Sequence, residues 1–212
     1  MKADGNLSIV HDHYKETFAI VRERERDRDR SFLLLIGLFA VLVVEVYYPA
    51  AAGGAVRSFQ ILGTDIDASR LPLSMLLNAT WVLALAVSLS YCRVAISIDR
   101  QYPYVHHLES WISEQLGDAS IYRREGNVYL ERYPLLLNWA WLCYVVVFPL
   151  VVSVVSILLV QREWTGLPYS IAHKGFDVGI AFLVIVSFLL YRVVPKVHER
   201  FIREGTKGVL HI

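Results

Sequence analysis

Three polar side chains lie inside or at the edge of long apolar runs. Glu45 follows the charge-free run 32–44, Asn78 lies early in a second apolar run, and Asp177 lies at the start of the last one. Ionisable groups are costly in a membrane and usually face a bundle interior or water. The placement gives the hypothesis of a polar path or gate lined by Glu45, Asn78 and Asp177. The alternative is an interfacial Asp177, with a Glu45 that is neutral or hydrogen-bonded to Asn78 or to a tyrosine.

A second set of candidate residues lies on two amphipathic segments. Apolar residues between 7 and 21 recur in steps of four, four and three, and another apolar face follows Pro103 until Gly117. Both patterns are typical of helices with one apolar side. These faces could cover each other, lie in the lipid headgroup layer or contact another protein. The residues expected to bind a partner are Tyr14, Phe18, Leu108, Trp111 and Ile112.

Histidines are the remaining candidates for chemistry. The candidates are His11, His13, His106, His107 and His198, all of which fall in segments predicted to be cytosolic. A zinc site needs three or four ligands at about 2 Å from one ion, and the spacings H-x-H and H-H do not by themselves make such a site. The sequence also has no common nucleophile, metalloprotease or nucleotide-binding motif. We therefore expect no metal site, no cofactor and no enzymatic activity.

Four apolar runs must position these residues. The chain is 55% hydrophobic with a positive mean hydropathy, yet 19% of its residues are charged, which is typical of apolar spans between water-exposed segments. A helix rises about 1.5 Å per residue, so a run of about 17 residues spans roughly 25 Å, near the lower limit for a bilayer. The sequence predicts an all-α membrane protein with four transmembrane helices. The predicted spans are about 32–48, 72–92, 135–160 and 176–194.

The polar segments define the predicted domain organisation. Residues 1–30 form an N-terminal segment whose alternating charges at 22–30 extend the first membrane helix. The transmembrane domain covers 31–195, includes a long loop at 93–133 with a hairpin or turns at 118–134, and is followed by a tail at 196–212. Prolines modify the spans: Pro149 predicts a kink in the third, and Pro195 ends the fourth.

Small residues give a separate indication. Thr80, Ala84 and Ser88 recur every four residues in the second span, a spacing that lets a neighbouring helix approach closely. The neighbour could belong to the same chain or to another subunit. Cys92 and Cys143 fall in apolar runs and read as packing residues.

Positive charge predicts the orientation. Seventeen of the 21 Lys and Arg residues lie in the N-terminal segment, the central loop and the C-terminal tail, and four lie in the two other connections. The positive-inside rule therefore places both termini and the central loop in the cytosol of a multi-pass inner-membrane protein. The net charge of +1, with signs that alternate, gives no reason to expect direct nucleic-acid binding.

Several segments resemble small four-span bacterial membrane proteins. The N-terminal match is His13-Tyr-Lys-Glu-Thr-Phe18, which leads to Arg28-Asp-Arg30. The others are Gln101-Tyr-Pro-Tyr-Val-His-His-Leu-Glu109, Arg124-Glu-Gly126, Tyr133-Pro134 and Asn138-Trp139. The architecture is similar to membrane components of bacterial antiphage systems, such as the Kiwa membrane subunit or the membrane accessories of some CRISPR loci. The resemblance covers the N-terminal third and the central loop, and it implies a role in defence.

Two functions follow as hypotheses. The first is a homo-oligomeric inner-membrane component of an antiphage defence system, which couples a soluble cytosolic protein partner or a signal to the lipid bilayer. The second is a small oligomeric ion channel or transporter with a polar path at Glu45, Asn78 and Asp177.

Overall fold

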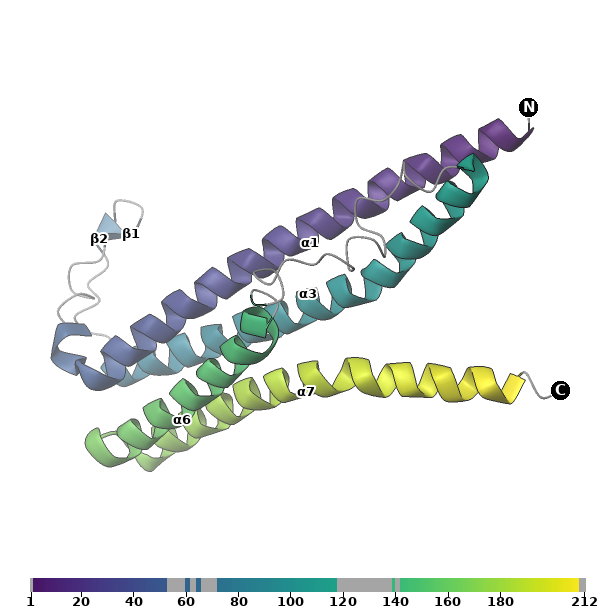
Figure 1. Ribbon diagram of the computed structural model, residues 1–212. Helices are drawn as coiled ribbons and strands as arrows, with labels where there is room; N and C mark the ends of the chain where they lie inside the picture. The colour runs from purple at the N-terminus through teal and green to yellow at the C-terminus, as the bar shows by residue number, and fades with distance from the viewer. Residues whose placement is uncertain are drawn as a thin grey trace. The chain divides into compact units, whose positions relative to one another are not determined.

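The computed structural model of the 212-residue chain is almost entirely helical (Figure 1). It describes residues 2–52, 60–61, 64–65, 72–117, 139 and 142–209, with side chains described over 9–52, 72–117, 139 and 142–193. Among the residues described, four helices are long and apolar enough to cross a membrane, in agreement with the predicted all-α membrane class. The predicted hairpin or turns at 118–134 lie outside the described residues.

The first helix, α1, is continuous over Lys2–Tyr47 and is 46 residues long. It includes the alternating charges at 22–30, where Arg24 and Asp27 pair at 4.0 Å on the surface. Such exposed pairs contribute only a few tenths of a kcal/mol each. The charged block is helical because it continues the apolar span that follows it, as the sequence predicted.

The helix α3 covers Leu73–Leu116 and contains Pro103. The helix predicted after Pro103 and its end at Gly117 are therefore confirmed, but the helix is not separate, because α3 continues from the second span through residues 93–103 without a break. A proline removes one helical donor, but the buried face continues on both sides of it at helical spacing, and packing outweighs that cost. The buried residues on this face are Val94, Ala95, Ile98, Val105, Leu108 and Ile112. Gly117 ends the helix with φ +66°, a conformation that favours glycine.

The third apolar segment begins with a short π-helix, η2, at Cys143–Val147, followed by α6 at Phe148–Gly166. Pro149 lies in the first turn of α6, where the missing N–H would have no helical partner anyway. The predicted mid-span kink is thus a change of helix type just before the proline. The helix also ends six residues beyond the predicted limit at Val160.

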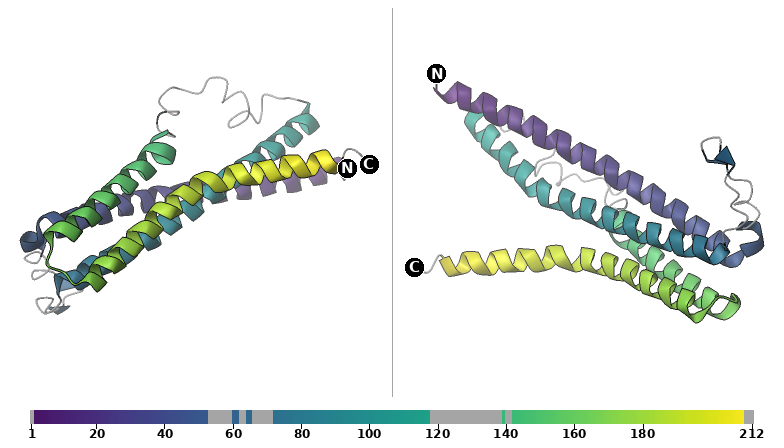
Figure 2. Two further views of the ribbon diagram at one scale, coloured as in Figure 1. Left: turned by 90° about the horizontal axis from the view of Figure 1, so that it is seen from below. Right: turned by 180° about the vertical axis from the view of Figure 1, so that it is seen from behind.

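The last helix, α7, covers Ile171–Val209 and runs past Pro195. The prediction that Pro195 ends the fourth span is therefore wrong for the helix, although the candidate span within the described side chains is Ile171–Val193. Only residues 167–170 separate α6 from α7, and Figures 1 and 2 show these two helices side by side. In the connection before α3, the strands β1 (Gln60–Ile61) and β2 (Thr64–Asp65) pair antiparallel.

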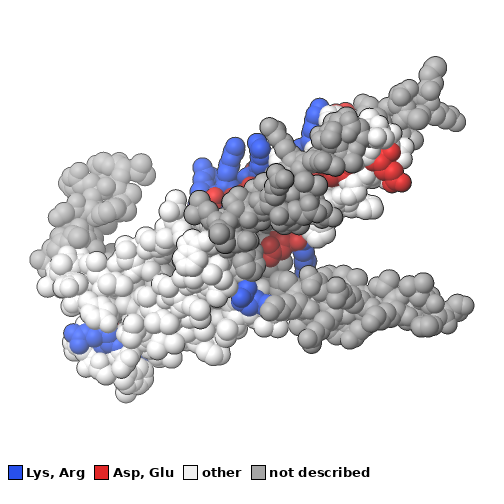
Figure 3. All heavy atoms as spheres, in the orientation of Figure 1, with Lys and Arg blue, Asp and Glu red and all other residues white. Residues whose placement is uncertain are grey.

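The chain divides into two compact units. The helix-pair unit contains Met1–Arg30 and Arg93–Val146, and the four-helix unit contains Ser31–Cys92 and Val147–Ile212. Figure 3 shows charged side chains gathered over the helix-pair unit, whereas the described surface of the four-helix unit is mostly uncharged. An uncharged surface of this extent is typical of contact with lipid.

Aromatic rings fill the interior of the four-helix unit. Phe148 of α6 lies 4.6 Å from Phe32, 5.5 Å from Tyr91 and 6.0 Å from Phe188, measured between ring centroids. The side chains of Thr80, Ala84 and Ser88 are also buried in this unit. The small residues therefore pack against helices of the same chain. This outcome selects the neighbour within the chain over the other alternative from the sequence, a helix of another subunit.

Candidate functional site

Each of the four helices in the four-helix unit contributes a polar side chain to one end of the bundle. The three carboxyl groups are Glu45 near the end of α1, Glu163 near the end of α6 and Asp177 near the start of α7, and they are 2%, 2% and 0% exposed. We call these three residues the acid cluster. Its end of the unit carries the short connection 167–170 between α6 and α7. The structure thus brings the predicted Glu45 and Asp177 into one bundle interior.

Glu45 is held by α3. Oγ1 of Thr80 lies 3.2 Å from Oε1 of Glu45 and 3.0 Å from the carbonyl oxygen of Leu76, one turn earlier. Oε2 of Glu45 has no hydrogen-bond partner among the described residues. A buried carboxylate oxygen without a donor is strongly unfavourable, so the surroundings of Oε2 disfavour an ionised Glu45.

Asp177 is held by Asn78, the third residue of the predicted polar path. The Asn78 amide satisfies its neighbours when its nitrogen faces the carboxylate: Nδ2 then lies 3.0 Å from both Oδ1 and Oδ2 of Asp177 and donates to the carbonyl oxygen of Ser74 at 3.1 Å. In the same orientation, Oδ1 of Asn78 accepts a hydrogen bond from Nδ1 of His173 at 2.9 Å. Asn78 therefore connects α3 to two residues of α7.

Glu163 is the cluster member that the sequence analysis missed. Its carboxyl group lies close enough to that of Asp177 to interact with it, and its Oε1 has no partner in the described part of the chain. Lys174 lies close enough to act on the charge of Glu163, and its Nζ donates to the carbonyl oxygen of Trp164 at 3.0 Å. The sequence does contain a pattern that could have identified Glu163, because this residue continues the buried stripe of α6 at helical spacing. That stripe consists of Phe148, Pro149, Val152, Ser156, Leu159 and Glu163.

The connection between α6 and α7 lies beside the cluster. Burial raises the pKa of the Tyr169 phenol, and the neighbouring acids Glu163, Glu45 and Asp177 raise it further. The pKa of Tyr169 thus depends on all three carboxyl groups. Arg162, one residue from Glu163, lies over the ring of Tyr47 at 5.7 Å and provides a positive charge at the same end of the unit.

Apolar residues close off the interior beyond the cluster. Trp81, next to Thr80 on α3, is 0% exposed and packs edge-on against Phe39 at 6.2 Å. The aromatic group around Phe148 follows further along the bundle. The buried cluster is therefore backed by apolar side chains on the side away from the α6–α7 connection.

The predicted partner-binding residues lie in the helix-pair unit. Leu108 and Ile112 are buried there, at 9% and 0% exposure, and Tyr14 donates from its hydroxyl to Oε1 of Glu109 at 2.9 Å. Phe18 stacks on Tyr14 at 6.1 Å, and Trp111 is half-buried. These contacts use much of the apolar faces to pack α1 against α3, while partner binding by the five residues stays a prediction.

Arg28 links the charged block to its own unit. Its guanidinium donates to Oδ1 of Asp29 at 3.0 and 3.1 Å and lies 4.9 Å from the centre of the Tyr144 ring. Burial lowers the pKa of Arg28, but Asp29, Glu25 and Tyr144 together raise it above its ordinary value. The charge of Arg28 in turn lowers the pKa of Asp99, which loss of water otherwise raises.

The histidines make individual contacts. His13 lies 2.8 Å from the hydroxyl of Tyr104, and Nδ1 of His106 lies 3.6 Å from Oε2 of Glu109. Within the described side chains, no group of three or more His, Cys, Asp or Glu residues is arranged to hold a metal ion. The side chain of His198 lies outside that part of the structure.

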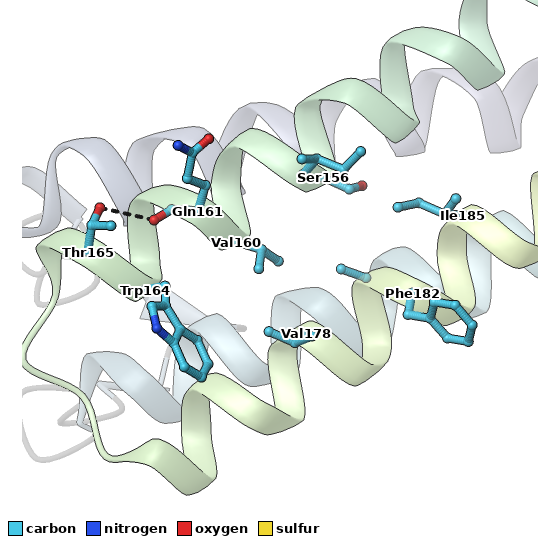
Figure 4. Close-up of a pocket in the computed structure, with 10 residues that line it drawn as sticks. Ser156, Val160, Gln161, Trp164, Thr165, Val178, Phe182 and Ile185 are labelled. Atoms are coloured by element: carbon cyan, nitrogen blue, oxygen red, sulfur yellow. Dashed lines mark hydrogen bonds between the residues drawn. The ribbon is translucent and has the colours of Figure 1, made fainter.

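An open groove lies between α6 and α7 (Figure 4). Val160 and Trp164 line it from α6, and Val178, Phe182 and Ile185 line it from α7. Most of its lining is apolar, with polar atoms from Gln161 and Thr165 near the end that carries the α6–α7 connection. The groove has the composition expected of a surface in contact with lipid.

The four apolar helices and the buried polar site define a multi-span helical membrane protein. Comparisons of the chain with protein-family models, with curated proteins and with solved structures found no match.

Proposed function

We propose that the protein is a homo-oligomeric inner-membrane component that couples a signal between the acid cluster and the helix-pair unit. The observation that carries this proposal is the continuity of two helices. α1 contains Glu45 and also Tyr14, which bonds to Glu109, and α3 contains Thr80 and Glu109. The role is one of coupling and requires no catalytic group.

Continuous helices can transmit a change in packing over a distance. A small rotation or shift of a helix moves every side chain on it, and packed interfaces respond by switching between discrete arrangements. A change in the contact between Glu45 and Thr80 would thus alter how α1 and α3 meet at Tyr14 and Glu109. The distribution of Lys and Arg favours a cytosolic helix-pair unit, where a soluble protein partner would be met.

Cross-linking tests this coupling. Cysteines would replace His13 and Tyr104, whose side-chain tips meet at 2.8 Å, in a chain with Cys92→Ser and Cys143→Ser, and a bifunctional thiol reagent would bridge the gap left by the shorter side chains. Glu45→Ala should change the rate of this cross-linking several-fold, because it removes the α1 side of the Thr80 contact. Met75→Ala, an exposed position on α3, serves as the control. Equal rates in all three backgrounds would reject the coupling.

The defence role extends this proposal and is supported by the resemblance to antiphage membrane components. A host strain that carries the gene in its native neighbourhood should reduce phage plating efficiency relative to an empty strain. Glu45→Ala should abolish the reduction, and Met75→Ala should retain it. Equal plating on strains with and without the gene would remove defence from the proposal.

The alternative is an oligomeric ion channel or transporter. It is favoured by the meeting of Glu45, Asn78 and Asp177 in one bundle interior. The apolar residues behind the cluster mean that such a path would run between copies of the chain. Ion flux into liposomes that is lost with Glu45→Ala would support the channel, and absence of flux in the wild type would reject it.

A further inference from the structure

The hydroxyl of Thr80 has one hydrogen and two nearby acceptors. The carbonyl oxygen of Leu76 lies at 3.0 Å and Oε1 of Glu45 at 3.2 Å. An ionised Glu45 only accepts hydrogen bonds, so it would compete with Leu76 for that hydrogen. A protonated Glu45 instead donates to Oγ1 of Thr80, which leaves the hydroxyl hydrogen for Leu76. Only the protonated state gives each of these contacts its own hydrogen.

The unpaired oxygen of Glu45 points to the same state. Oε2 has no partner in the described chain, and the residue is 2% exposed. An uncharged carbonyl oxygen without a donor costs much less free energy in this position than one oxygen of an ionised carboxylate does.

A second proton is required between Glu163 and Asp177. Their carboxyl groups are 2% and 0% exposed and lie close enough to interact, and two ionised carboxylates repel each other strongly when both are buried. The proton belongs to the pair, because either oxygen can carry it. Asn78 stabilises the remaining negative charge by donating from Nδ2 to Asp177.

Charge balance agrees with two protons. Three carboxyl groups with two protons carry one negative charge, and the half-buried Lys174 next to Glu163 supplies one positive charge, whereas the side chain of Arg162 is exposed. A buried group of charges is tolerated only when it is compensated in this way. Both oxygens of Asp177 face the Asn78 amide nitrogen, which would repel a metal cation.

The charged and titratable groups around the cluster are few. α1 contributes Glu45, and α3 has no charged side chain between Leu73 and Tyr91. The groups from α6, α7 and their connection are Arg162, Glu163, Tyr169, His173, Lys174 and Asp177. Tyr169 and His173 are half-buried at this end of the unit.

We propose that the acid cluster is a two-proton site, with one proton on Glu45 donated to Thr80 and one shared by Glu163 and Asp177. The protons exchange with water at the end that carries the α6–α7 connection. Opening the Glu45–Thr80 contact exposes Glu45 to water and releases its proton. The signal in the proposed coupling is then the uptake and release of these protons. The proton site rests on the proposed function only for its role as a signal.

Infrared spectroscopy of the full-length protein in liposomes at neutral pH tests the proton count. The wild type should show a protonated-carboxyl band that shifts in D2O. Glu45→Gln and Glu163→Gln should each remove about half of the cluster's contribution, while Glu25→Gln should remove none, since Glu25 accepts a bond from Tyr102 outside the cluster. Gln resembles a protonated Glu in shape and as a donor, so both variants should fold.

Three results would overturn the proposal. Loss of a carboxylate band in Glu45→Gln, in place of a protonated band, would show an ionised Glu45. A protonated band that falls on addition of Na⁺ or Mg²⁺ would show a cation site. Loss of folding in Glu45→Gln with retention in Thr80→Val would show that Glu45 does not act as a donor to Thr80. Cross-linking between residues 13 and 104 tests the coupling separately, so a failed proton count leaves that result intact.

Discussion

Thr80 and Glu45 meet across α3 and α1, with Oγ1 and Oε1 3.2 Å apart in the interior of the four-helix unit. The contact joins the two helices that continue into the helix-pair unit. It is also a contact that a single substitution can remove without changing the charge of the chain. The first prediction tests it.

Thr80→Val should destabilise the protein by about 1–3 kcal/mol, because Glu45 loses its hydrogen-bond partner in a buried site. Valine has nearly the shape of threonine, so packing is preserved. Thr80→Ser keeps the hydroxyl and should retain most of the stability that Thr80→Val loses. Chemical denaturation in detergent would compare the two variants, and a loss in Thr80→Val no larger than that in Thr80→Ser would contradict the assigned role of the hydrogen bond.

Asn78→Leu should cost about 3 kcal/mol, because Asp177 loses the amide that donates to its carboxylate and His173 loses its acceptor. Met75→Ala on the same helix is a control, since Met75 is 56% exposed. The same unfolding measurement applies. A loss no larger than that of the control would mean that the bond between Asn78 and Asp177 does not stabilise the bundle.

Tyr14→Phe should destabilise the helix-pair unit by about 1–3 kcal/mol, because Glu109 is 3% exposed and accepts the Tyr14 hydroxyl hydrogen. Tyr104→Phe removes the exposed contact with His13 and should cost much less. Hydrogen exchange of the backbone amides around Glu109 would report the difference. Equal protection in both variants would contradict the assigned role of Tyr14.

Arg28→Gln should raise the pKa of Asp99, because the positive charge that lowers it is lost. An acid with a raised pKa in the folded state favours folding at low pH, so the stability of the variant should fall more than that of the wild type as pH rises through the Asp99 titration. The effect is small because Asp99 is exposed. NMR titration of the Asp99 carboxyl would measure it. Arg24→Gln, which removes an exposed charge of the same block, should leave this titration unchanged.

The sequence predicts the four apolar helices because each contains a charge-free run long enough to be recognised without its neighbours. It does not predict that α3 continues through Pro103 or α7 through Pro195. Proline disfavours a helix locally, and only the packing of distant residues offsets that cost. Local pattern therefore located the spans but not their ends.

Local sequence pattern also predicted only part of the acid cluster. Glu45, Asn78 and Asp177 were found because each interrupts an apolar run. Glu163 was missed because it follows Gln161 and Arg162, which read as the start of a polar loop. Its burial depends on the continued stripe of α6, and a stripe is visible only when the helix is extended past Val160.

The helix α1 is longer than a bilayer is thick. Its 46 residues correspond to about 69 Å at 1.5 Å per residue, more than twice the roughly 30 Å thickness of a hydrocarbon core. A bilayer with its headgroups is about 40–45 Å thick, so no usual tilt brings the whole helix inside it. One continuous helix is therefore long enough to hold both a membrane span and a water-exposed segment.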